Sequence, residues 1–380
     1  MRIIKSHILK LTTALVLFHL PGGYDAKAQE LLMPERWKCA LSHIRPLFSQ
    51  DTLTISFFGD MMMHSAQIAN ARTSASEYDF SSYFHLLEDK IKDADLTVAN
   101  MEFTLAGEPY TGYPCFSAPD TLAAYLAECG FDIFLAANNH IFDKGAKGAE
   151  RTLKIFRRLQ EEKGIKFTGL AGGTEELNGN NPLMVRVKGI NLAFINLTYG
   201  TNSGTDTRWP VTNHIEEKEK TAAAFATAKA KGADYIIALP HWGTEYQLRH
   251  SRKQEETAQW LAGNGADFII GTHPHVVQDT GLIGNTPVIY SLGNAVSNMS
   301  AVNTQLELMA TLKIVRHCNG DLIALPLELD FLWCSRPGGL NAHYTVIPIE
   351  AYKEKPELWE GRHDYDKMIS TYERVRKEIE

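Results

Sequence analysis

The sequence lacks the features that mark several common classes of protein. It carries 38 Lys and Arg against 45 Asp and Glu, a net charge of −7, and no run of more than two basic residues. Nucleic-acid binding depends on concentrated positive charge, so this composition excludes a DNA or RNA partner. The GxSxG, GxxxxGK[ST] and HExxH patterns are also absent, which excludes the commonest serine-hydrolase, P-loop and zincin motifs.

Cysteine is scarce, and its spacing excludes a thiolate metal site. The five cysteines include no CxxC pair. Their odd number leaves at least one thiol free or paired between chains. We interpret them as small buried apolar residues or as one structural bridge.

No apolar run is long enough to span a membrane, but the N-terminus has the pattern of an export signal. Arg2, Lys5 and Lys10 precede the apolar stretch Leu11–Leu20, which is followed by Ala26-Lys27-Ala28. This pattern predicts a signal peptide over residues 1–28, with a mature N-terminus at Gln29 and a periplasmic or secreted location. A retained anchor is the alternative, but the stretch falls short of the roughly 20 residues that a span requires.

The remaining sequence alternates short apolar runs with segments of helical period, which is typical of an α/β fold. We expect a lead-in over 29–50, a folded domain over 51–350 and a charged, solvated helical tail over 351–380. The expected strands are 53–58, 96–99, 133–136, 183–187, 192–196, 235–239, 268–270 and 288–291, and the expected helices are 119–129, 148–163, 215–231 and 252–263. Apolar runs at 307–315 and 322–331, separated by Asn319-Gly320, predict a hairpin.

Polar side chains able to bind metal follow five of these apolar runs. They are Asp60, Glu102, Asn139, His241, and the pair His273 and His275. Each alone is explained as a turn or cap residue. Because ligands bind at the carboxyl edge of the strands in open α/β sheets, five such ends together predict one shared site.

The residue types suit a divalent ion. Neutral imidazoles with carboxylates favour zinc, manganese or iron, and Asp60 or Glu102 could bridge two ions, so we expect one or two of them. His140, directly after Asn139, is the candidate proton donor to a leaving group, and its alternative is a capping histidine.

Four residues beyond His241 are candidates for binding substrate. Trp242, Glu245 and Tyr246 could form a pocket wall, and Arg249 could attract an anionic substrate. The alternative is a packed aromatic loop that leads into a charged helix start.

These motifs together resemble a known family, the CapA-type capsule-synthesis proteins with a calcineurin-like metallophosphatase fold. The resemblance runs from about Leu53 to Asn294 and rests on six motifs: Phe58-Gly59-Asp60, Asn100-Met101-Glu102, Ala137-Asn138-Asn139-His140, His241-Trp242-Gly243-Thr244-Glu245, Gly271-Thr272-His273-Pro274-His275 and Ser291-Leu292-Gly293-Asn294. It implies a β-sandwich flanked by helices (α-β-β-α), a divalent metal site and a role in making or exporting poly-γ-glutamate or a related polymer. It also implies that Asn139 binds metal and His140 acts as acid.

Two positions depart from the wider metallophosphoesterase pattern. Met62 stands where an Asp-x-His motif has histidine, and Glu102 stands where an aspartate would bridge. His64 is a speculative substitute for the missing imidazole.

Three functions remain open from the sequence. The first is a metal-dependent hydrolase or processing factor acting on an anionic capsule-like polymer, in association with its synthesis machinery. The second is a non-catalytic factor that binds polymer during export, and the third is a secreted phosphoesterase acting on small phosphorylated molecules. Met62 favours the second, whereas Asn139 and His140 favour an enzyme.

Overall fold

The computed structural model describes residues 52–203, 209–317 and 319–379. Most of the described residues form one compact unit, over Leu53–Ile314 and from Ala324 onward, while Thr52 and Val315–Ile323 belong to a second, smaller unit. The predicted signal peptide and lead-in lie outside the described residues. Among the helices of the described ranges, none is both long and apolar enough to cross a membrane.

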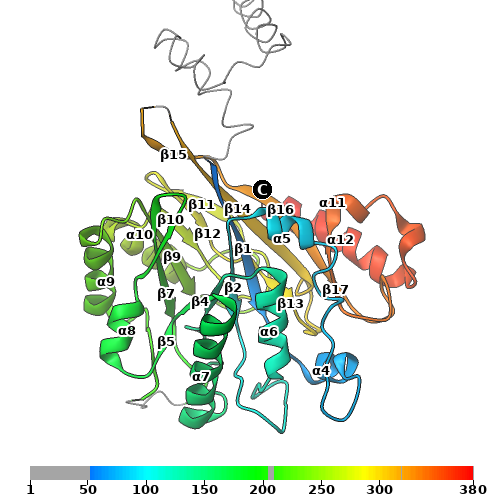
Figure 1. The fold of residues 1–380 in the computed structure, drawn as a ribbon. Coiled ribbons are helices and arrows are strands. Elements are labelled where there is room, and N and C mark those ends of the chain that lie inside the picture. Colours follow the sequence, from blue (N-terminus) through cyan, green and yellow to red (C-terminus); the bar gives the residue numbers. More distant parts are fainter. Residues whose placement is uncertain (1–51, 204–208, 318, 380) are drawn as a thin grey trace, which may run out of the picture. The chain divides into compact units, whose positions relative to one another are not determined.

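Strands and helices alternate along the larger unit, as expected (Figure 1). The strands are β1 (Thr52–Met61), β2 (Leu96–Met101), β3 (Ile133–Leu135), β4 (Lys166–Thr168), β5 (Leu170–Ala171), β6 (Leu183–Val187), β7 (Ile190–Thr198), β8 (Val211–Thr212), β9 (Tyr235–His241), β10 (Phe268–Ile270), β11 (Thr280–Ile283), β12 (Thr286–Ile289), β13 (Asn294–Val296), β14 (Leu306–Arg316), β15 (Leu322–Ala324), β16 (Glu328–Ser335) and β17 (Thr345–Pro348). The helices are α4 (Ser65–Ala71), α5 (Glu88–Asp93), α6 (Asp120–Cys129), α7 (Gly145–Lys163), α8 (Thr174–Asn180), α9 (Lys218–Ala230), α10 (Arg252–Asn264), α11 (Ile349–Tyr352), the 3₁₀ helix η3 (Pro356–Leu358) and α12 (Arg362–Ile379).

Two sheets form the centre of the fold. The first has the order β17-β16-β14-β1-β2-β3-β4 with β13 beside β1, and the second has the order β11-β12-β10-β9-β7-β6. The strands β1, β2 and β3 run parallel, as do β7, β9 and β10. The strand β2 is buried at every residue, as expected of a strand covered on both faces, and its polar residues Thr97 and Asn100 are buried with it.

Helices cover the outer faces of both sheets. Side chains of α6 and α7 share one apolar cluster with the first sheet, and those of α9 and α10 share another with β7, β9 and β10. Figure 1 shows α6 and α7 beside β2 and β4, and α9 and α10 beside β7 and β10. The predicted α/β class, a β-sandwich flanked by helices, is confirmed.

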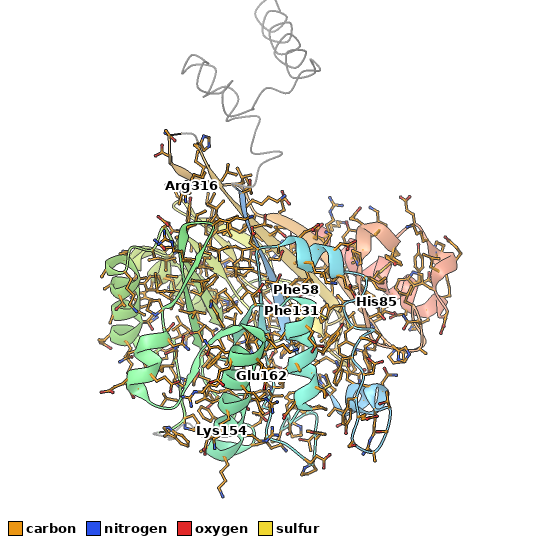
Figure 2. The ribbon with its side chains drawn as sticks, viewed as in Figure 1. Phe58, His85, Phe131, Lys154, Glu162 and Arg316 are labelled. Atoms are coloured by element: carbon orange, nitrogen blue, oxygen red, sulfur yellow. The ribbon has the colours of Figure 1, made fainter. Side chains whose placement is uncertain are left out.

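Aromatic packing fixes β1 in the first sheet, where the candidate site begins. The rings of Phe58 on β1 and Phe131 after α6 lie 5.1 Å apart at 66°, an edge-on contact (Figure 2). Lys154, on the outer side of α7, points away from the ribbon in the same view. The helix therefore turns its apolar side to the sheet and its charges to water.

The predicted hairpin is present as the antiparallel pair β14 and β16, with Leu306 opposite Trp333 and Thr311 opposite Glu328. In the smaller unit, the amide of His317 donates to the carbonyl of Asp321 across the Asn319-Gly320 turn. Gly320 has φ +91°, a value that glycine adopts without strain. The turn chemistry thus follows the sequence expectation.

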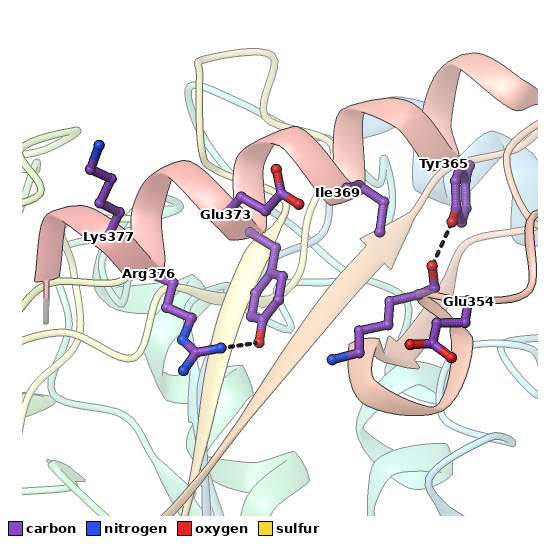
Figure 3. Close-up of a pocket in the computed structure, with 8 residues that line it drawn as sticks. Glu354, Tyr365, Ile369, Glu373, Arg376 and Lys377 are labelled. Carbon is purple, nitrogen blue, oxygen red and sulfur yellow. Dashed lines mark hydrogen bonds between the residues drawn. The ribbon is translucent and has the colours of Figure 1, made fainter.

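The prediction of a solvated C-terminal helix holds for only part of its surface. One face of α12 is buried, and the ring of Tyr372 lies 5.2 Å from that of Phe331 on β16. The Asp364 carboxylate accepts hydrogen bonds from Ser335 and Trp333. A shallow pocket beside α12 is lined by acidic and basic side chains, including Glu373, Arg376 and Lys377 (Figure 3). None of the predicted site residues lines it.

Candidate metal centre

The polar residues that follow the strands meet at the carboxyl ends of both sheets. Asp60 lies near the end of β1, paired with Asn100 of β2 on one side and with Asn294 of β13 on the other. His241 ends β9 and forms a bridge with Thr272, which follows β10. Because the strands involved are parallel, their carboxyl ends open on the same side of each sheet.

One group of possible metal ligands consists of Asp60, Glu102 and His275. One ligand atom from each lies within 4.8 Å of the other two. The Asp60 Oδ2 is 3.5 Å from the His275 Nδ1, and the His275 Nε2 is 3.8 Å from the Glu102 Oε1. All three side chains are buried.

A second group shares the carboxylate of Glu102. It combines Glu102 with His241 and His273, again with ligand atoms within 4.8 Å of one another. The His241 Nε2 lies 3.6 Å from the Glu102 Oε1 and 2.8 Å from the Asn139 Oδ1. The six residues that the sequence analysis singled out as ligands thus come together around Glu102, and their coordination of an ion stays a prediction.

The residues present fit a bound cation, because several buried atoms have no other partner. Both oxygens of Glu102 and the Nδ1 of His273 are buried and accept or donate no hydrogen bond. An unpaired buried carboxylate costs several kcal/mol or neutralises by taking up a proton. A divalent ion would satisfy these atoms together, so the cluster could hold one.

The electrostatics of the cluster agree with that fit. Burial, followed by the charge of Asp60, raises the pKa of Glu102 well above its ordinary value. Burial, followed by the neighbouring histidines, lowers the pKa values of His241 and His273 well below theirs. Both imidazoles are therefore neutral at physiological pH, which is the form that binds a metal.

Hydrogen bonds from neighbouring side chains orient the candidate ligands. The Nδ1 of His241 lies 3.0 Å from the Thr272 hydroxyl, and that of His275 lies 2.9 Å from the Asn294 Oδ1. Asn100 donates to the Asp60 Oδ1 at 2.7 Å. Such partners fix the ring orientation of metal-binding histidines. The sequence analysis did not single out these three residues, although each stands within a motif quoted there.

His140 is held by a carboxylate that the sequence analysis also missed. Its Nδ1 lies 2.7 Å from the Asp143 Oδ2, and its Nε2 lies 3.9 Å from the Glu102 Oε1. The Phe116 ring packs edge-on against the imidazole at 4.7 Å, and the Phe116 amide donates to the same Asp143 oxygen. The Nε2 of His140 is thereby directed toward the cluster, and its catalytic role stays a prediction.

The four predicted substrate residues are placed differently from one another. Trp242 is buried in the core of the second sheet, where its indole donates to the Tyr290 carbonyl at 2.9 Å. Arg249 forms ion pairs with Asp279 and Glu378. Glu245 and Tyr246 remain beside the cluster, because Glu245 lies near His273 and His275 and the Tyr246 ring is 6.4 Å from that of His275.

A further buried carboxyl group, Glu307 on β14, lies behind the site. Its Oε1 accepts a hydrogen bond from the Gly59 amide at 2.8 Å, and its Oε2 has no partner. Gly59 must lack a side chain, since a Cβ there would stand 2.0 Å from the Gly293 carbonyl oxygen. Burial raises the pKa of Glu307 from 4.5 to about 8, although the hydrogen bond from Gly59 opposes the shift.

This shift predicts a pH-dependent stability. A raised pKa in the folded state means that Glu307 contributes its full stability below pH 4.5 and loses it as the pH rises through about 8. The interval corresponds to at most about 5 kcal/mol. The free energy of unfolding of Glu307→Gln should rise relative to that of the natural chain as the pH is raised from 5 to 9, because Gln does not titrate. Urea unfolding in the presence of a chelator measures this difference.

Glu255→Gln, on the exposed side of α10, is the control for this measurement. It should differ from the natural chain by a small amount at both pH values, because solvent screens a surface charge. A difference in unfolding free energy between Glu307→Gln and the natural chain that stayed constant with pH would contradict the raised pKa of Glu307.

Comparison with known proteins assigns the chain to a family. Residues 54–299 match the family described as "Bacterial capsule synthesis protein PGA_cap". The match covers more than half of the chain and includes all the candidate ligands. The chain therefore belongs to this family of bacterial capsule synthesis proteins, and the resemblance stated from its motifs is confirmed.

Individual relatives are more distant. The chain is 25% identical over 313 residues to the "Capsule biosynthesis protein CapA" of Bacillus anthracis, covering 79% of this chain and 73% of the relative. It is 23% identical over 291 residues to the "PGA biosynthesis protein CapA" of Bacillus subtilis (strain 168), covering 74% and 73%.

Solved structures of similar arrangement include two nucleotidases. A 5'-nucleotidase precursor from Thermus thermophilus matches with TM-score 0.43 and 14% identity, over 86% of this chain and 59% of that one. A 5'-nucleotidase from Candida albicans matches with TM-score 0.44 and 10% identity, over 84% and 57%. This chain spans less than two thirds of either nucleotidase.

Proposed function

We propose that this protein is an extracytoplasmic, metal-dependent hydrolase or processing factor for poly-γ-glutamate or a related anionic capsule polymer. The observation that carries the proposal is the buried cluster around Glu102, whose two carboxylate oxygens have no hydrogen-bond partner. Membership of the capsule synthesis family supports the polymer as substrate. The predicted export signal, which lies outside the described residues, supports the location.

In this proposal, Asp60, Glu102 and His275 would hold one ion, and Glu102, Asn139, His241 and His273 would hold another. A bound divalent ion such as manganese, zinc or iron polarises a carbonyl or phosphoryl oxygen and acidifies bound water. The side chains of Thr272, Asn294 and Asn100 keep the ligands in place. His140, held by Asp143, donates a proton to the leaving group as the bond to it breaks.

A non-catalytic polymer-binding factor is the second candidate, and one observation favours it. Met62 is 1% exposed and packs in the apolar core of the first sheet, so the imidazole of an Asp-x-His motif is missing. A centre with fewer ligands on one side could bind an ion and an anionic polymer without cleaving the polymer.

The decisive experiment compares the purified chain with and without its metal. We expect elemental analysis to find one or two manganese, zinc or iron ions per chain. The metal-loaded chain should shorten poly-γ-glutamate, and chelation should abolish that turnover. Metal retention with binding but no cleavage would favour the second candidate. Turnover of p-nitrophenyl phosphate alone would favour a phosphoesterase acting on small molecules.

A further inference from the structure

The candidate site on the Asp60 side is short of ligands. Met62 cannot replace the missing imidazole, because its sulfur lies 3.7 Å from the Ser297 hydroxyl and its side chain is packed in the core. Asp60, Glu102 and His275 then supply three ligand atoms. Divalent ions of the first transition series take at least four ligands, so further donors must come from water or from another side chain.

His64 does not supply that donor. Its Nδ1 lies 3.1 Å from the Gln67 Oε1 and accepts a hydrogen bond from the Asn298 amide at 3.3 Å. The residue also caps the N-terminus of α4 together with Gln67. Among the described residues, His64 belongs to no group of three possible ligands. The substitute suggested by the sequence is therefore engaged in holding the fold.

Glu245 lies where a further carboxylate could reach the centre. One of its carboxylate oxygens and ring nitrogens of His273 and His275 all lie within 4.8 Å of one another. These two imidazoles belong one to each of the two ligand groups around Glu102. Building on the proposed metal-dependent function, we propose that Glu245 is a metal ligand that compensates for the imidazole missing at position 62.

The loop that carries Glu245 is fixed to the loop that carries the two histidines. The Tyr246 amide donates to the Pro274 carbonyl at 2.9 Å, and Pro274 stands between His273 and His275. This hydrogen bond holds the residue next to Glu245 against the residue between the two imidazoles. The backbones of the two loops are thus joined directly beside the three possible ligands.

Side-chain amides anchor the same loop from behind. Gln254 donates to the Gln278 Oε1 at 2.8 Å, and Gln278 donates to the Gln247 carbonyl at 2.8 Å. Gly243, with φ +102°, lets the chain turn against Gln254, whose amide would stand 2.7 Å from an added Cβ. A loop supported in this way holds its carboxylate at a fixed position, which metal coordination requires.

Backbone strain is concentrated at these residues. His273, His275 and Tyr246 have φ values of 100°, 58° and 65°, and they are three of the five non-glycine residues with positive φ in the described ranges. Such conformations cost about 1–3 kcal/mol each and persist where the surroundings impose them. Three strained residues thus carry or adjoin the possible ligands, at positions where the surrounding structure must hold the backbone.

The test measures metal binding directly, without reference to turnover. Manganese is titrated into the metal-free chain, and free Mn²⁺ is followed by electron paramagnetic resonance. Glu245→Gln keeps the shape of the side chain but removes its charge, and Glu245→Ala removes the donor. We expect Glu245→Gln to weaken one Mn²⁺ binding event by about 10-fold or more, and Glu245→Ala at least as much. The matched control, Glu255→Gln, should bind as the natural chain does.

Each outcome decides the inference. Melting temperatures in chelator show whether the variants remain folded, and the isosteric Glu245→Gln is expected to match the natural chain. Unchanged Mn²⁺ affinity in both variants would overturn the inference, and a loss of polymer binding or turnover in that case would make Glu245 a substrate contact. If the natural chain bound no Mn²⁺, zinc or iron, the proposed function itself would be wrong. That outcome is measured on the natural chain alone and is therefore distinct from a failure of the Glu245 inference.

Discussion

His241→Ala should be purified without the ion that we propose His241 binds together with Asn139 and Glu102. The Nε2 of His241 lies 2.8 Å from the Asn139 Oδ1 and 3.6 Å from the Glu102 Oε1, in a fully buried position. Losing this imidazole removes one of the few neutral groups that can bind the metal ion, and the buried position gives water little access to replace it. We expect the affinity for that ion to fall by about 100-fold or more, as measured by elemental analysis and metal titration.

The fold should survive this change, because His241 ends β9 and the strand keeps its ladder to β7 and β10. His85→Ala is the matched control, since His85 is exposed, its Nδ1 lies 2.8 Å from the Ser82 carbonyl, and it belongs to none of the groups of possible ligands among the described residues. That variant should retain the metal content of the natural chain. Full occupancy in His241→Ala would remove His241 from the ligand set and weaken the proposed function.

His140→Ala should keep its metal and lose turnover by about 10²–10⁴-fold. The imidazole contacts Asp143 through Nδ1 and approaches Glu102 at 3.9 Å through Nε2, so it stands beside the candidate ligands without completing either group. The reason for the loss is the missing proton for the leaving group. Single-turnover assays of poly-γ-glutamate cleavage, paired with elemental analysis of the same preparation, provide the measurement.

Asp143→Asn tests how much the turnover depends on the carboxylate that orients the His140 ring, with His140 itself still present. The amide keeps an oxygen near the ring but no longer favours the tautomer that presents Nε2 to the cluster. We expect a loss of turnover smaller than that of His140→Ala, with unchanged metal content. Turnover equal to that of the natural chain in both variants would leave His140 with only a structural role.

Most of the fold follows from local patterns in the sequence. Short, mainly apolar runs predicted β10 residue for residue and the first four of the six residues of β2, because parallel strands covered on both faces bury most of their side chains. The boundaries of α6 and α10 also agree within a residue, since Gly130 and Gly265 end them in left-handed conformations. The polar residues directly after the strands predicted the cluster, because the carboxyl ends of parallel strands open on the same side of a sheet.

The residues that were missed act through partners distant in sequence. Asn294 holds His275 from 19 positions away, and Thr272 holds His241 from 31 positions away. No local pattern reports such pairs. Trp242 is adjacent to His241 in sequence, but successive residues of an extended chain point to opposite sides, and its indole is buried in the core of the second sheet.

The C-terminal helix shows how charge can conceal a buried face. Its sequence is rich in both signs of charge, and the pattern suggested a helix surrounded by water. Tyr365, Met368, Tyr372 and Val375 recur at helical spacing and are buried. Four apolar or aromatic residues on one side suffice for docking, because the charged residues occupy the remaining circumference.

The glycine at position 59 also sets a limit on how this centre could change. Its α-carbon faces the Gly293 oxygen at a separation that leaves no room for a methyl group, and the next residue, Asp60, pairs with Asn294 and belongs to the candidate centre. Any larger residue would wedge β1 away from β13 and displace a candidate ligand together with the support of His275. The spacing of the candidate ligands therefore depends on one position that carries no functional group at all.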